Sequence, residues 1–195
     1  MENKFINSTA AELLGKLGQT SPAKTEEIAK IINQHSMIAA GAGWIPFPFV
    51  DLAVVAGNVW KMYVSINKVI GISFTGNFMK SVGSGVVANL SSAIVSSQLF
   101  SLLKLIPGLG TVSAGLLLMA GNYATCTTAG WVYLKALTSI ASEEGVIDPS
   151  DPEMKKKFKR AVKEHKDESK KLKDELQKDY ILEEKEKEEK EKLNN

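Results

Sequence analysis

Charged residues are almost absent from the middle of this chain. Residues 81–103 and 105–134 contain no Asp, Glu, Lys or Arg, whereas residues 153–195 carry 15 Lys/Arg and 13 Asp/Glu. A soluble domain normally has charged side chains along all of its surface elements. We therefore expect the middle of the chain to be covered by the rest of the protein, by a partner protein or by lipid.

The composition of the 195-residue chain narrows the class of function. Its net charge is only +2, and Lys alternates with Glu in the tail, so a basic surface for nucleic acid is not expected. The single cysteine, Cys126, excludes an internal disulfide and suits a reducing compartment. Polar residues follow the first Met without a short apolar core, so no secretory signal is expected.

The sequence predicts no catalytic residue, no cofactor site and no metal site. His35, His165 and Cys126 are far apart in the sequence and lack metal-ligand or nucleophile–base spacing. Residues 71–78 imitate a phosphate-binding loop, but Asn77 stands where that loop requires a Lys. We therefore expect a protein that is not an enzyme.

Hydrophobic periodicity predicts an all-α fold, a compact apolar bundle of two helical hairpins with a long charged C-terminal helix. The expected helices cover residues 8–20, with Ser8 or Thr9 as N-cap, then 22–40, 49–70, 77–103 and 111–141. The C-terminal helix is expected from Asp151–Pro152 to about residue 190, with a weak apolar seam suited to a partner. That seam consists of Phe158, Val162, Leu172, Leu176 and Tyr180.

Composition also divides the chain into three ranges. Residues 1–35 form N-terminal amphipathic helices, residues 36–147 an apolar helical domain, and residues 148–195 a charged helix or tail. Structural turns are predicted at Pro46, Pro48, Pro107, Gly108 and Gly110.

Small residues recur at every fourth position in two of the expected helices. They are Ser84, Ala88, Ser92 and Ser96 in the first helix, with Gly85 on a neighbouring face, and Gly121, Thr125 and Ala129 in the second. Small side chains at this spacing let two helix backbones approach closely. These residues are therefore predicted to form helix-packing contacts.

Two features near residue 50 have more than one interpretation. Trp44, Phe47 and Phe49 suit either anchoring at a membrane interface or closing the end of a soluble bundle. Asp51 is the one acid among residues 36–140. It is either a buried acid paired with a lysine or a first-turn residue favoured by the helix dipole. The sequence favours the first-turn interpretation.

Three segments resemble the bacterial YcjF-like, GTPase-associated family of domains of unknown function. They are Ile45–Asp51 with Asn58–Met62, Leu103–Thr111 and Thr125–Gly130, within residues 35–140. The resemblance implies an α-helical apolar domain found beside Era-like GTPases and often linked to the inner membrane. This chain departs from the fused members because it has a charged tail in place of a GTPase domain. The family offers no catalytic residues to carry over.

Three functions remain open at this stage. The first is a membrane-associated helical module, an accessory or adaptor to a GTPase or another partner, on the cytoplasmic side of the inner membrane. Residues 81–134 would then form a hairpin in lipid, because each uncharged segment is long enough to span it. The second is a soluble all-α scaffold or adaptor in the cytoplasm. The third is a pore-forming or membrane-inserting effector. Membrane lipid is the expected partner, and a homo-oligomer is compatible with each function.

Overall fold

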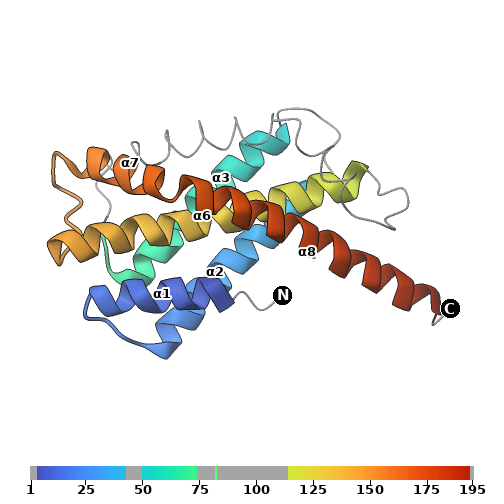
Figure 1. The fold of residues 1–195 in the computed structure, drawn as a ribbon, viewed down its shortest axis with the longest axis horizontal. Helices are drawn as coiled ribbons and strands as arrows, with labels where there is room; N and C mark the ends of the chain where they lie inside the picture. The colour runs from blue at the N-terminus through green and yellow to red at the C-terminus, as the bar shows by residue number, and fades with distance from the viewer. Residues whose placement is uncertain (1–3, 43–49, 74–81, 83–113, 194–195) are drawn as a thin grey trace.

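The computed structural model describes residues 4–42, 50–73, 82 and 114–193, which are shown in colour in Figure 1. Within these residues the chain contains six helices and no strand, which confirms the predicted all-α class. The helices are α1 (Lys4–Lys16), α2 (Pro22–Gly41), α3 (Val50–Ile70), α6 (Ala114–Glu144), α7 (Met154–Glu164) and α8 (Lys166–Leu193). The predicted helix over residues 77–103 lies outside the described residues except at Val82.

The limits of α2 and α3 follow from local chemistry. Ser21 is the N-cap of α2, and its hydroxyl accepts the backbone N–H of Lys24 at 3.3 Å. Pro22 occupies the first helical position, where its missing N–H costs nothing. α3 ends at Ile70 because Gly71 adopts a φ of 73°, a left-handed conformation that favours glycine.

Two predicted helix starts are wrong. The first helix begins at Lys4, and Thr9 lies inside it, where its hydroxyl donates to the Phe5 carbonyl at 2.9 Å. The charged segment begins its helix at Met154, and Asp151 closes the preceding turn instead. The Asp151 carboxylate accepts the backbone N–H of Glu153 at 2.8 Å.

The charged C-terminal segment is two helices and not one. His165 separates α7 from α8 because its backbone, at φ −95° and ψ 12°, leaves the helical region. The predicted seam is nevertheless real: Phe158, Leu176 and Tyr180 are buried, each against the chain's own bundle. The partner of this seam is therefore intramolecular.

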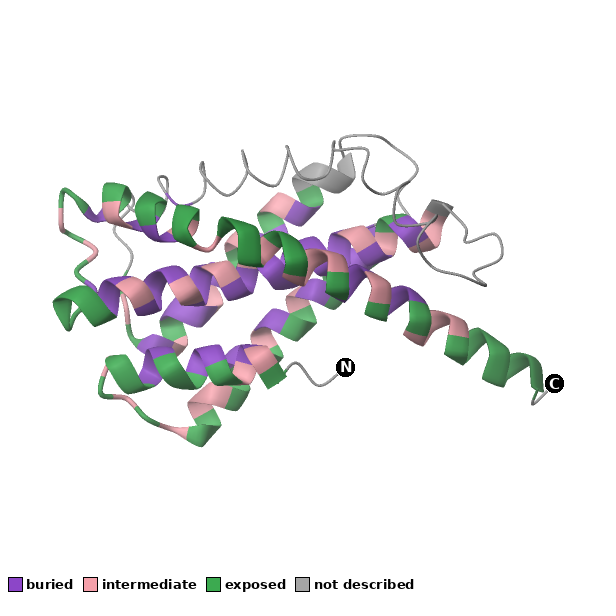
Figure 2. Ribbon diagram, in the orientation of Figure 1, coloured by how far each residue is buried: buried purple, intermediate pink, exposed green. Residues whose placement is uncertain are grey.

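The central element of the bundle is α6. It packs against α1, α2, α3, α7 and α8, and Figure 2 shows it buried along most of its length. A helix that is apolar on nearly all sides needs such a cover. One core cluster joins Leu13 of α1, Ile32 of α2, Met62 of α3, Leu137 of α6 and Phe158 of α7. Among the helices of the described ranges, none combines the length and apolarity needed to cross a bilayer.

Candidate functional site

A hydrogen-bonded polar cluster ties α2, α3 and α6 together inside the bundle. The Asn58 side-chain nitrogen donates to the His35 carbonyl at 2.6 Å and to the Cys126 sulfur at 3.7 Å. The Asn58 oxygen accepts from His35 Nδ1 at 2.7 Å. Because an amide oxygen can only accept, the His35 proton on this side must be carried by Nδ1.

The cluster continues along α6 through buried hydroxyl groups. Thr127 donates to the Ser36 hydroxyl at 2.8 Å, and Ser36 donates to the Ile32 carbonyl at 2.8 Å. Farther along, the Tyr133 hydroxyl donates to the Asn67 side-chain oxygen at 2.8 Å. The Tyr133 ring stacks on that of Tyr63, with centroids 4.1 Å apart.

This cluster holds helices together and offers no reactive group. Burial raises the pKa of the Cys126 thiol to about 12, although hydrogen bonds with Ser36 and Asn58 act in the opposite direction. Burial likewise raises the pKa of the Tyr63 and Tyr133 hydroxyls. A thiol of this kind is a poor nucleophile and metal ligand, because both roles need the thiolate. Within the described ranges, no group of three or more His, Cys, Asp or Glu residues is placed to hold a metal ion.

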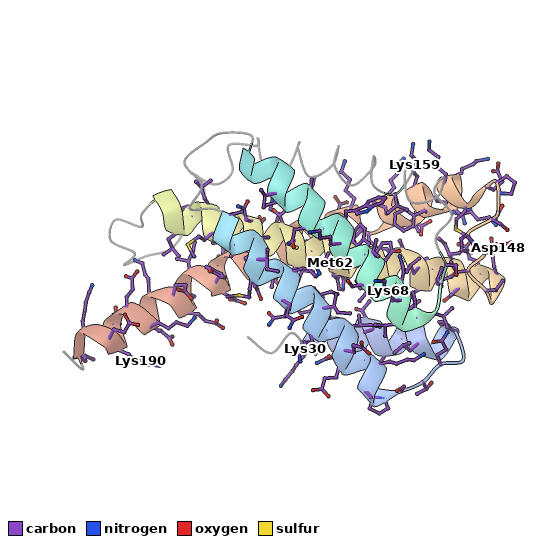
Figure 3. The ribbon with its side chains drawn as sticks, turned by 180° about the vertical axis from the view of Figure 1, so that it is seen from behind. Lys30, Met62, Lys68, Asp148, Lys159 and Lys190 are labelled. Carbon is purple, nitrogen blue, oxygen red and sulfur yellow. The ribbon has the colours of Figure 1, made fainter. Side chains whose placement is uncertain are left out.

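The surface feature that stands out is a bundle end without charge. α2 ends, α3 begins and α6 begins on the same side of the molecule (Figure 1). Residues 31–41, 50–60 and 114–134 supply these helix ends, and Asp51 is their one Asp, Glu, Lys or Arg. By contrast, Lys68, Asp148 and Lys159 lie toward the opposite end of the bundle (Figure 3). The charge-free middle of the sequence thus supplies three helix ends that carry one charged residue between them, and we call this side the uncharged end. The charged distal part of α8, with Lys190, runs out on the same side (Figure 3).

Large apolar side chains are exposed at this uncharged end. Ile38 is 57% exposed and Met37 is 48% exposed on α2, while Val54 of α3 and Leu118 of α6 are each 38% exposed. All four lie within four residues of a helix end on this side, and we call them the rim. A group of apolar side chains without nearby charge is typical of a surface that contacts lipid or a partner protein.

Beside this rim, α8 covers an apolar part of α6 and α2. A second core cluster combines Leu176, Tyr180 and Ile181 of α8 with residues of α6 and with Ala40 of α2. The α6 members are Leu117, Ala120, Tyr123 and Ala124. The rings of Tyr180 and Tyr123 meet with centroids 5.0 Å apart. Beyond Leu182 the helix runs out past the bundle as an exposed charged rod (Figure 2).

The structure describes only part of the predicted site. The turn residues Pro46, Pro48, Pro107, Gly108 and Gly110 lie outside the described residues. The same is true of the predicted anchors Trp44, Phe47 and Phe49, and of the packing residues Ser84, Gly85, Ala88, Ser92 and Ser96. Asp51 is the second residue of α3, which is a first-turn position; the structure describes its backbone and not its side chain.

The second group of predicted packing residues lies on α6. Thr125 is buried, while Gly121 and Ala129 are half-buried. The Ala129 carbonyl accepts a hydrogen bond from the Tyr63 hydroxyl at 3.1 Å. The close helix approach that the described residues contain is one position away, at Gly130. A Cβ atom there would lie 3.0 Å from Ile32 of α2.

Sequence reasoning missed Gly130 as a packing residue, although a signal was present. Glycine inside a long helix costs about 1 kcal/mol relative to alanine and therefore usually has a packing reason. Its partner could not be deduced, because spacing within one helix does not identify the helix that approaches it.

Comparison of the chain with protein-family models, curated proteins and solved structures gives no match. The resemblance to YcjF-like domains therefore stays a prediction from the residues.

Proposed function

We propose that this chain is a non-enzymatic, membrane-associated helical module whose uncharged end contacts a lipid surface. The observation that supports the proposal is the separation of charge between the two ends of the bundle. In the sequence, the aromatic residues Trp44, Phe47 and Phe49 stand between the end of α2 and the start of α3.

The energetics fit reversible peripheral binding. Covering four partly exposed apolar side chains contributes about 1 kcal/mol each, because full burial of such a side chain is worth about 1.5–3 kcal/mol. The sum, about 4 kcal/mol, is close to the weak and reversible anchoring that a single acyl chain provides. None of the four rim side chains is charged, so none of them has to lose the hydration of a charge on contact.

Vesicle flotation with a matched pair of variants tests the proposal. Ile38 lies at the uncharged end and is 57% exposed, while Val146 lies beyond the other end of α6 and is 58% exposed. With vesicles of neutral and anionic phospholipid, Ile38→Asp should lower the bound fraction about tenfold, because a charge must then enter the apolar contact. Val146→Asp should leave binding unchanged. Equal behaviour of the two variants would contradict the proposal.

An adaptor that binds a protein at the same end, without lipid, is the second candidate. It is favoured by the position of α6, since most of residues 117–134 are already covered by other helices of the chain. The family resemblance suggests a GTPase as this partner. The chain would then fail to float with vesicles, and Ile38→Asp would instead weaken binding to a purified GTPase.

A further inference from the structure

The contact between α8 and the bundle contains a polar group that is poorly suited to burial. Gln177 is 2% exposed, and its side-chain nitrogen has no hydrogen-bond partner. An unpaired buried amide opposes the contact, because it loses its hydrogen bonds to water without replacement. The apolar residues of α8 are thus buried together with an amide that is better satisfied in water.

The part of α6 beneath α8 offers no charge to hold the helix in place. α6 has no Asp, Glu, Lys or Arg before Lys135, so residues 117–124 cannot form an ion pair with α8. The residue between α7 and α8, His165, is attached to α6. The His165 ring meets the edge of Trp131 with centroids 5.9 Å apart, and its Nε2 lies 3.4 Å from the Ser139 hydroxyl.

The direction of α8 also conflicts with contact between the uncharged end and a flat surface. Figure 1 shows α8 continuing past the first residues of α6 on the same side of the molecule. Its distal part, residues 183–192, consists of Glu and Lys alone. While α8 stays in place, this charged rod projects beside the apolar rim toward any surface that the rim approaches.

We infer that the face of α6 and α2 beneath α8 is an interaction surface for a lipid bilayer, and that α8 is the releasable strap that covers it. Release about His165 uncovers Leu117, Ala120, Tyr123 and Ala124 together with Ala40. Leu117 directly precedes the exposed Leu118 in α6, and Ala40 follows the exposed Met37 by one helical turn in α2, so release adds apolar area next to these residues and removes the charged rod from it. The inference rests on the proposed membrane function.

Two α8 variants with opposite expected effects test the inference. Gln177→Leu removes the unpaired amide and should slow hydrogen exchange of residues 172–181 about tenfold. It should also lower the fraction of protein bound to phospholipid vesicles. Tyr180→Ser removes an aromatic contact with α6, so exchange of the same residues should accelerate and vesicle binding should rise. Gln34→Leu, the same change at an exposed position of α2, is the control and should leave α8 exchange unchanged.

The outcomes separate this inference from the proposed function. If residues 172–181 exchange as slowly as α6, both in the wild type and in Tyr180→Ser, then α8 is not releasable and the inference is overturned. If the wild type floats with vesicles but neither α8 variant changes the bound fraction, the inference fails and the proposed function stands. If neither the wild type nor Tyr180→Ser floats, both are overturned.

Discussion

α7 and α8 are neighbours with similar charge-rich sequences, yet they are attached to the bundle in different ways. Phe158 of α7 belongs to the main core, and Arg160 of α7 forms an ion pair with Glu143 at the end of α6. Leu176 and Tyr180 of α8 belong to the smaller second cluster, where α6 has no charge to offer. A charge-rich composition therefore does not show how firmly a helix is held; its buried partners decide that.

The largest expected effect comes from removing the core residue of α7. Phe158→Ala should lower the free energy of unfolding by about 3–5 kcal/mol, since it leaves a cavity beside the Tyr133 ring. Tyr180→Ala should lower it much less, because α8 can leave the bundle without unfolding the main core. Urea unfolding followed by circular dichroism measures both changes. Equal losses would show that α7 and α8 are held alike.

The next expected effect concerns the packing of α2 against α6 in the main core, to which α7 is also attached. Gly130→Leu should lower the free energy of unfolding by about 1–3 kcal/mol, because its side chain would collide with the fully buried Ile32. Gly57 is the control, since it is exposed in α3 and no heavy atom lies within 4 Å of an added Cβ. Gly57→Leu should raise stability by up to about 1 kcal/mol through helix propensity alone. A stabilising Gly130→Leu would mean that the α2–α6 contact is loose.

Local features of the fold were predictable because their causes lie within a few residues. Ser21 and Pro22 start α2 through a cap and a fixed φ angle, and Gly71 ends α3 through its positive φ. Periodicity also identified the buried side of the charged segment at Phe158 and Tyr180. In each case the signal needs only the neighbours of the residue in the same helix.

Contacts between helices were not predictable, because they depend on how each helix is rotated and placed. His35 and Asn58 are 23 residues apart and on different helices, and nothing in the sequence pairs them. The uncharged end has the same origin. Residues 31–41 and 50–60 join the long charge-free segment only because three helix ends meet on one side. The sequence shows that this segment lacks charge, but it does not show where the segment lies in the folded molecule.

The smallest expected effect concerns the ionic attachment of α7 and its dependence on pH. The Lys157 ammonium donates to Asp151 at 2.7 Å and also pairs with Glu144. The hydrogen bond from Lys157, and then that from the Glu153 N–H, lower the pKa of Asp151. A carboxyl whose pKa is lower in the folded state stabilises the fold above its unfolded pKa, and this contribution disappears as pH falls through the folded pKa.

Asp151→Asn should therefore lower the urea midpoint modestly at pH 6, and the difference from the wild type should shrink as pH falls below about 4, the range in which an ordinary Asp is protonated. The α8 contact has no such carboxylate pair with α6, so Gln177→Leu should shift the midpoint equally at pH 6 and pH 3. A pH-independent effect of Asp151→Asn would mean that the Asp151–Lys157 pair does not help to hold α7. The difference in attachment between α7 and α8 would then come only from their buried core residues, and not from the ion pairs of α7.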